Sequence, residues 1–194
     1  LIAPTVINKG KIEAPDGQVA MAAGAKVFLR TASAYGDDNV RGLLVEVDSP
    51  VGLVDFDTAN ADVKNGLLDG EAVELTNPAE DKLGHATNLG ELTSPRGNVT
   101  MVGYAVNQKG IARATTSVVA NGSVYLLAKD RTVVPTSIPD QTKSGSRSDR
   151  AGRVVLGANS LIEVLPDVAD ATGALDGETG MGLPAKSQVQ VLGQ

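Results

Sequence analysis

The segment from Asn8 to Met21 recurs without a gap between Asn88 and Met101. The two copies share Asn, Gly, Pro, Gly, Val and Met at matching places. A gapless internal repeat in a chain of 194 residues is typical of a solenoid, in which neighbouring repeats stack on one another. Because solenoids mostly provide surfaces and scaffolds, the repeat predicts a structural or binding role rather than a catalytic centre.

Short strand-like segments recur after glycine along the chain. Each segment places two apolar residues one apart, which puts both on one face of a strand, and the residue between them is mostly tolerant of solvent. The segments are Gly17–Met21, Gly70–Leu75, Gly97–Met101, Gly122–Leu126 and Gly152–Leu156. The residues predicted to point inward are Val19, Met21, Val73, Leu75, Val99, Met101, Val124, Leu126, Val154 and Leu156.

A second repeated piece, Asn-x-Gly or a variant of it, precedes several of these strands. It occurs at Asn8, Asn88 and Asn107, with a looser copy at Asn65. Because Asn and Gly best tolerate left-handed backbone, the piece predicts a tight corner. Short strands alternate with corners, and no long stretch keeps an apolar period of 3.6 residues, so we predict an all-β protein.

The spacing of these pieces favours a β-helix. Asn88 and Asn107 are 19 residues apart, and Gly97 and Gly122 are 25 residues apart. Coils of about 20 residues with loops of variable length fit these intervals and place the two gapless copies four coils apart. The chain would then form roughly eight coils, a rod of about 40 Å. A β-sandwich also uses short strands, but it would not explain the gapless repeat.

The order of Pro, Asn, Gly, Val and Met in Leu1–Gly24 and Ser94–Gln108 resembles the coils of one known family. That family is the filamentous haemagglutinins, the large exoproteins of bacterial two-partner secretion, and the resemblance covers residues 1–130. It implies a right-handed parallel β-helix. The family's Asn-Pro-Asn-rich segment, which marks secretion competence, is absent here, so we expect the later part of the secretion domain and the adjoining coils of the β-helix.

The same resemblance implies a function. It implies export through an outer-membrane β-barrel transporter, a location outside the cell or on its surface, and a role in attachment, aggregation or biofilm. A host-cell receptor or a polysaccharide would then be a further partner. Two alternatives stay open: the stalk of a contact-dependent toxin-delivery exoprotein, and a β-helical polysaccharide-degrading enzyme. Because the acidic residues are scattered through loops, we expect no catalytic residue and no cofactor.

Composition and patterning bound the organisation of the chain. We expect one β-helical domain over residues 1–194, cut from a larger exoprotein, with an extra-helical loop at 131–150 and further coils at 151–194. A net charge of −6 argues against nucleic acid as a partner. Since there is no Cys, disulfides and thiolate metal sites are excluded. No apolar run approaches the roughly 20 residues of a membrane-spanning helix, so we expect no membrane insertion.

One stretch that breaks the repeat could hold a metal ion. Asp55, Asp57, Asn60 and Asp62 place carboxylate and amide oxygens in one predicted loop. Such oxygens are the ligands that Ca²⁺ prefers. The sequence lacks the Gly at the sharp turn and the distal Glu of an EF-hand, so the alternative is a solvated acidic loop without a metal.

A second such stretch is basic. Arg147, Arg150 and Arg153, together with Lys143, form a basic patch on an acidic protein. The patch predicts a contact for an anionic polysaccharide or an acidic partner, and the alternative is a mobile polar loop.

Two further patterns have simple interpretations. His85 is the only histidine and has no recognisable catalytic context, so we expect a surface or corner position. The triplets that begin at Asn98 and Asn121 match the glycosylation sequon, although such triplets often arise by chance.

Overall fold

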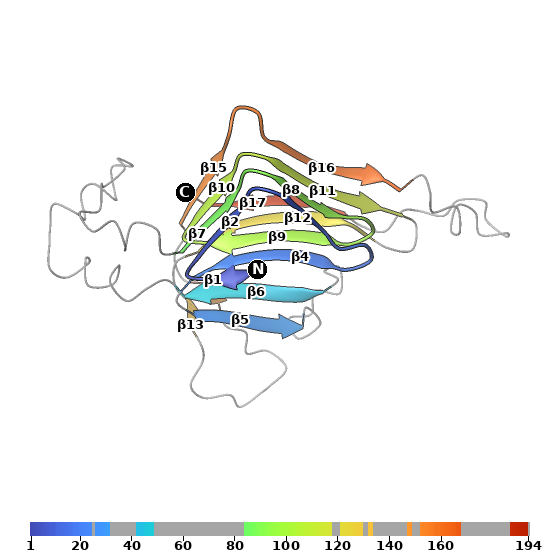
Figure 1. The fold of residues 1–194 in the computed structure, drawn as a ribbon. Coiled ribbons are helices and arrows are strands. Elements are labelled where there is room, and N and C mark those ends of the chain that lie inside the picture. The colour runs from blue at the N-terminus through green and yellow to red at the C-terminus, as the bar shows by residue number, and fades with distance from the viewer. Residues whose placement is uncertain are drawn as a thin grey trace, which may run out of the picture.

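The computed structural model describes residues 1–24, 26–31, 42–48, 84–117, 121–129, 132–133, 147–148, 152–167 and 187–193. Within these ranges the chain forms β-strands and no helix, which confirms the all-β prediction. Three parallel sheets, seen along their stacking direction, lie as the three sides of a triangle (Figure 1). By their places in that view they are the base, left and right sheets.

The base sheet is ordered β1 (Ile2–Ala3), β4 (Gln18–Ala23), β9 (Asn98–Gly103), β12 (Ser123–Ala128) and β17 (Val189–Leu192). The left sheet is ordered β2 (Thr5–Asn8), β7 (His85–Asn88), β10 (Ala105–Gln108) and β15 (Arg153–Leu156). The right sheet is ordered β3 (Lys11–Glu13), β8 (Glu91–Ser94), β11 (Ile111–Thr116) and β16 (Leu161–Pro166).

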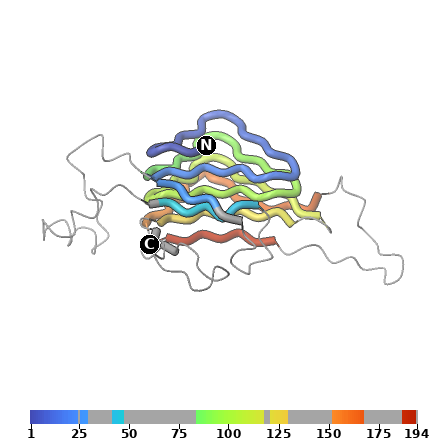
Figure 2. The backbone as a smooth tube through the Cα atoms, turned by 90° about the horizontal axis from the view of Figure 1, so that it is seen from below, coloured from blue at the N-terminus to red at the C-terminus, as the bar shows by residue number. Residues whose placement is uncertain are grey.

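The chain visits the three sheets in turn, so each pass lays one strand in each sheet. The passes are β2–β3–β4, β7–β8–β9, β10–β11–β12 and β15–β16–β17, and β1 adds a short strand to the base sheet before the first. Figure 2 shows these passes stacked one below another. The backbone hydrogen bonds of all three sheets therefore run along one direction, from pass to pass.

The two gapless copies lie on neighbouring passes. Asn8 pairs directly with Asn88, and Met21 pairs directly with Met101. The prediction that they lie four coils apart is wrong, because direct pairing leaves no room for an intervening pass. The described residues make four passes, not eight. Much of the interval is an insertion that contains β5 (Lys26–Thr31) and β6 (Leu43–Asp48), an antiparallel hairpin outside the three parallel sheets.

Most of the predicted inward residues form the core between the three sheets. Val19, Met21, Val99, Met101, Val124 and Leu126 are at most 3% exposed, as predicted. Val154 is partly buried against this core. The prediction for Leu156 is wrong, because Leu156 is 51% exposed and pairs with Gln108 at the end of a left-sheet strand. Val73 and Leu75 lie outside the described residues.

A ladder of buried side-chain amides runs along the corner between the left and right sheets. Asn8 Nδ2 donates to Asn88 Oδ1 at 2.9 Å, and Asn88 Nδ2 donates to Gln108 Oε1 at 2.9 Å. Gln108 Nε2 then donates to the carbonyl oxygen of Gly110 at 2.9 Å. The third rung is therefore Gln108, and the expectation that Asn107 forms this corner is wrong by one residue. Asn107 instead faces outward from β10.

The glycines that follow the amides allow neighbouring passes to pack closely, and they do not adopt left-handed backbone. The positive φ angles among the described residues belong to Asp16, Arg96, Gly42 and Gly84. The corner glycines Gly10, Gly90 and Gly110 do not have a positive φ angle, so the expectation that they provide left-handed backbone is wrong. A Cβ on Gly90 would lie 2.0 Å from the carbonyl oxygen of Gly10, and one on Gly110 would lie 2.1 Å from that of Gly90.

The first pass offers a control for this packing. A Cβ on Gly10 would meet nothing within 4 Å, because no described pass lies beyond it. We expect Gly90→Ala to lower the free energy of unfolding by about 2 kcal/mol through overpacking, and Gly10→Ala to leave it nearly unchanged. Chemical denaturation followed by circular dichroism measures both. Equal effects of the two substitutions would contradict close packing as the role of Gly90.

The β5–β6 hairpin covers the outer face of the base sheet. Thr100 and Tyr125, which point outward from β9 and β12, are only 3% and 6% exposed. The expectation that such positions face solvent is wrong for these two, because the hairpin gives this sheet a second buried side. The residues of this second core are Ala22, Val45, Val47, Val102, Tyr125 and Leu127, with Ala20 and Val27 packed against them.

Polar contacts also hold the hairpin to distant strands. Lys129 Nζ lies 2.5 Å from Glu46 Oε1, and the Glu46 side chain is 5% exposed. Gln18 Nε2 donates to the carbonyl oxygen of Leu43 at 2.9 Å, and Gln18 Oε1 accepts from the Leu43 backbone N–H at 2.8 Å. A second antiparallel pair, β13 (Thr132–Val133) with β14 (Arg147–Ser148), lies within the segment expected to leave the coils.

Candidate functional site

The structure describes few of the residues predicted to bind. Asp55, Asp57, Asn60 and Asp62, the calcium candidates, all lie outside the described residues. Within the described ranges, no group of three His, Cys, Asp or Glu side chains could hold a metal ion. The prediction for these four residues therefore stays a prediction.

The three predicted arginines are described to different degrees. Arg147 lies in β14, where its side chain is not described, and Arg150 and Lys143 lie outside the described residues. Arg153 begins β15 and is exposed on the outer face of the left sheet. His85 lies in the same sheet, half-buried at the start of β7. The structure therefore places Arg153 and His85 on one face, level with each other on the two strands that flank β10.

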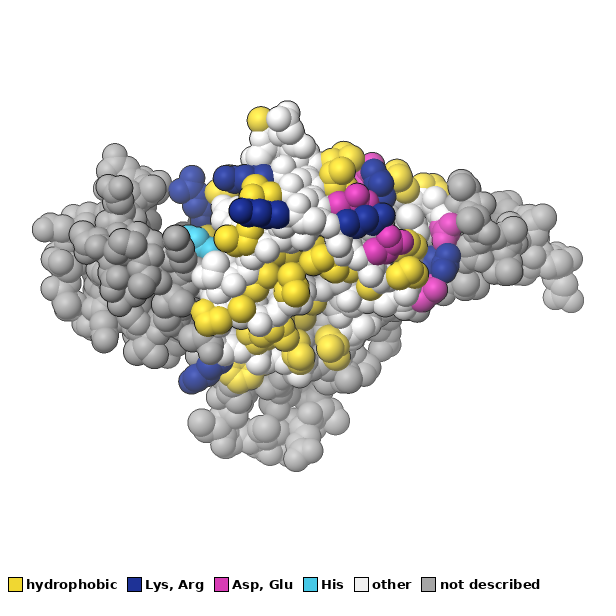
Figure 3. Space-filling model, viewed as in Figure 1, with side chains coloured by type: hydrophobic (Ala, Val, Ile, Leu, Met, Phe, Trp, Pro, Cys, Tyr) yellow, Lys and Arg dark blue, Asp and Glu magenta, His cyan; other side chains and the backbone are white. Residues whose placement is uncertain are grey.

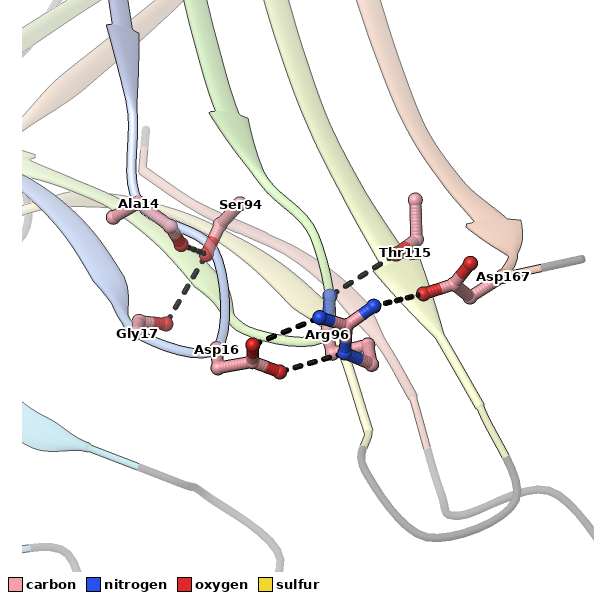
Figure 4. Close-up of polar contacts among 7 residues, drawn as sticks. All are labelled: Ala14, Asp16, Gly17, Ser94, Arg96, Thr115 and Asp167. Carbon is pink, nitrogen blue, oxygen red and sulfur yellow. Dashed lines mark hydrogen bonds and ion pairs between the residues drawn. The ribbon is translucent and has the colours of Figure 1, made fainter. Parts of the chain in front are cut away.

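The turn between the right and base sheets carries a cluster of charged residues (Figure 4). Arg96 Nε donates to Asp16 Oδ1 at 2.6 Å, and Arg96 Nη2 donates to Asp16 Oδ2 at 2.8 Å. Arg96 Nη1 donates to Asp167 Oδ2 at 2.7 Å, and the Arg96 backbone N–H donates to Thr115 Oγ1 at 3.0 Å. The Arg96 side chain, which belongs to the second pass, thus contacts the first and fourth passes, and the Arg96 backbone contacts the third pass.

The backbone of this turn is strained. Asp16 and Arg96 hold corresponding places in the two gapless copies, and their φ angles are 57° and 53°. Residues with a Cβ rarely adopt this left-handed conformation, which costs about 1 kcal/mol each. The hydrogen bonds to Asp16 and then to Asp167 raise the pKa of Arg96 above its ordinary value, so Arg96 stays charged. The cluster is thus a clasp between passes.

Removing the clasp is expected to weaken the stack modestly. In Arg96→Asn the new residue still tolerates left-handed backbone, so the substitution isolates the loss of the ion pairs. Because Arg96 is partly exposed and Asp16 mostly so, solvent weakens these ion pairs, and we expect only a small loss in the free energy of unfolding. Urea denaturation measures it. A loss no larger than that of Lys11→Asn, a lysine with an exposed side chain on the same stack, would contradict the clasp.

The outer face of the right sheet carries charges of both signs in pairs. Lys11 Nζ lies 2.9 Å from Glu13 Oε2 and 3.7 Å from Glu91 Oε1. Arg113 Nε lies 2.5 Å from Glu163 Oε1 two strands further along the face. Each cation on this face is therefore matched by a carboxylate on its own or a neighbouring strand.

These contacts make the stability of the stack depend on pH. Thr93 Oγ1 donates to Glu91 Oε1 at 2.8 Å, and this bond, helped by Lys11 and Arg113, lowers the pKa of Glu91 from its ordinary value of 4.5. The stabilisation of the folded state by ionised Glu91 is fully present above pH 4.5 and is lost as the pH falls through the lowered pKa. We expect Glu91→Gln to melt slightly below the wild type at pH 7. Thermal melts in acid should show that difference vanish, and a constant difference would contradict this origin.

The outer face of the left sheet differs from that of the right sheet. Residues 4–9, 84–89, 104–109 and 152–159, which contain its four strands, include no Asp or Glu. Lys9, Lys109 and Arg153 are exposed on this side and make no ion pair with any residue that the structure describes. Figure 3 shows dark blue side chains without magenta over the left slope, and both colours over the right slope. Sequence reasoning missed Lys9 and Lys109, because only the pairing of strands places them near Arg153.

The two sequons are buried in the folded chain. Asn98 is 1% exposed inside β9, and Asn121 is 6% exposed. A glycan on either side chain would have to displace packed neighbours, so the folded chain does not present these residues as acceptors.

Comparisons of this chain with protein-family models, with curated proteins and with solved structures found no match. In the part of the chain that the structure describes, no helix is long and apolar enough to cross a membrane.

Proposed function

We propose that this chain is a segment of a secreted or surface-exposed adhesin-type exoprotein, exported by two-partner secretion, in which a β-helical scaffold presents surfaces for attachment. One observation carries the proposal. Four passes of the chain stack around an apolar core, and no described group of three His, Cys, Asp or Glu side chains could hold a metal ion. Such an architecture offers faces rather than a pocket.

We propose further that the passes are the coils of a right-handed parallel β-helix. In-register pairing of each pass with the next, in all three sheets, supports the β-helix. Parallel strands joined by a crossover are right-handed in nearly all proteins, which supports the hand. A crystal structure tests it, and a left-handed path from the left sheet to the right sheet would overturn it.

The stacking also supports export through a transporter as an unfolded thread. A pass needs only its neighbour as a template, so folding can proceed one pass at a time as the chain emerges. The absence of Cys removes any need for disulfide exchange along the route. A β-barrel transporter of the two-partner type is the partner that this route requires.

Attachment is the activity to test. Fluorescent beads coated with the chain are expected to bind cultured epithelial cells several times more densely than beads coated with the Met101→Asp chain, which we expect to be unfolded. Flow cytometry measures the binding. Equal binding of both coatings, across a panel of cell types and a plastic surface, would overturn the attachment role.

A further inference from the structure

The left sheet gathers exposed cations that pair with no described carboxylate, on a chain whose net charge is −6. Its outer rows are Thr5, His85, Ala105 and Arg153, then Ile7, Thr87, Asn107 and Val155, and at the corner Lys9, Leu89, Lys109 and Gly157. Carboxylates neutralise the cations on the right sheet, whereas no carboxylate that the structure describes pairs with Lys9, Lys109 or Arg153 on the left sheet. Because the left-sheet face presents exposed cations without a described carboxylate partner and the right-sheet face does not, a ligand with negative charge would complement the left-sheet face.

The strand register gives the spacing of these charges. Lys9 and Lys109 stand at the same corner two strands apart, so their backbones are separated by about 10 Å. Arg153 is level with Ala105, four residues before Lys109, so about 13 Å along the strand separates it from the corner. The charges are therefore sparse and lie on a flat surface. They suit an extended polymer with well-separated anionic groups better than a single phosphate.

The side chains between the cations are suited to sugars. Asn107 Nδ2 donates to Thr87 Oγ1 at 3.2 Å, which places an amide and a hydroxyl side by side in the middle of the face. Ile7 and Leu89 are 54% and 47% exposed beside them and offer apolar surface to the C–H faces of a sugar ring. Nucleic acid is disfavoured, because its closely spaced phosphates would be repelled by the acidic remainder of the chain.

We propose that the left-sheet face, formed by Lys9, Lys109, Arg153 and the neutral side chains between them, binds a linear acidic polysaccharide that lies across the strands. The inference rests on the proposed function, since it names the ligand class through which attachment would occur. Sulfate or carboxylate groups of successive sugars contact the three cations, and sugar hydroxyls contact Thr87 and Asn107.

Binding of a chondroitin sulfate decasaccharide to the purified chain tests the proposal. The variant Lys9→Gln/Lys109→Gln/Arg153→Gln is expected to bind about tenfold more weakly than the wild type, which corresponds to about 0.5 kcal/mol for each lost contact. The control Lys11→Gln/Lys26→Gln/Arg113→Gln changes the net charge equally but leaves the face intact, and its affinity is expected to stay within twofold. Circular dichroism confirms that both variants are folded.

Three results would overturn the proposal. They are no binding by the wild type, an equal loss in the control variant, and equal affinity for single-stranded DNA of the same total charge. The bead assay separates this inference from the proposed function. If beads bind cells with the left-face variant as well as with the wild type, the polysaccharide face is wrong and attachment stands. If wild-type beads do not bind at all, the attachment role itself is wrong.

Discussion

A chain that carries Met101→Asp is expected to show no cooperative unfolding transition, because the substitution places a carboxylate in the centre of the core. Met101 is fully buried, and the register sets it between Met21 and Leu126 on the neighbouring strands. No cation lies in this core, so the carboxylate would have to be buried without a partner or neutralised. The cost, about 4 kcal/mol or more, takes up much of the stability of an ordinary domain.

Leu156→Asp is the matched control for this prediction. The apolar pattern alone assigns Leu156 and Met101 to the same inward set, whereas the structure leaves Leu156 51% exposed. We therefore expect Leu156→Asp to keep the melting temperature of the wild type within a few degrees. Thermal melts followed by circular dichroism measure both variants. A normal transition in Met101→Asp, or a lost transition in Leu156→Asp, would contradict the burial that separates them.

Asn88→Ala is expected to cost the next largest amount of stability, about 3 kcal/mol, because it breaks the amide ladder in the middle. Asn88 Oδ1 accepts from Asn8 Nδ2 and from the Gly90 backbone N–H, and its Nδ2 donates to Gln108 Oε1 and to the Ile111 carbonyl. The substitution leaves several of these groups without a hydrogen-bond partner in a buried corner. Each buried group left unpaired costs about 1–3 kcal/mol of stability.

Asn107→Ala controls for the loss of an amide near the same corner. Asn107 faces outward and is half-buried, and its side chain donates to Thr87 Oγ1. We expect this substitution to change the free energy of unfolding by less than about 1 kcal/mol. Equilibrium denaturation in urea measures the pair of variants. A greater loss of stability in Asn107→Ala than in Asn88→Ala would indicate that Asn107 forms the buried corner, as the sequence spacing predicts, and would contradict the observed register.

The repeat correctly predicts stacking, but its spacing alone gives the wrong number of passes between its copies. Dividing 80 residues by a coil of about 20 assumes that every residue between the copies belongs to a coil. The pairing of Asn8 with Asn88 shows that the copies are neighbours. Inserted residues lengthen the chain without adding a pass, and nothing in the local pattern of β5 and β6 distinguishes an antiparallel hairpin from two further coil strands.

The candidate site was only partly predictable for a related reason. Arg153 was found from sequence because other arginines lie near it in the chain. Lys9 and Lys109 were not, because 100 residues separate them and only the register of β2, β7 and β10 brings them to one corner. The sequence also does not show which cations are paired. Lys11 and Arg113 look like Lys9 and Lys109 in sequence, yet among the described residues carboxylates pair only with Lys11 and Arg113.

The sequence by itself determined the strands that follow the glycines, the corners at Asn8 and Asn88 and most of the inward residues. These depend on local properties: the period-two apolar pattern and the positions of Asn and Gly. Only the tertiary structure decided which strands are neighbours, which outward residues the hairpin buries, and on which face the cations have no described carboxylate beside them. These features depend on contacts between residues far apart in the chain, and a one-residue change of register, as between Asn107 and Gln108, exchanges the buried and exposed sides of a strand.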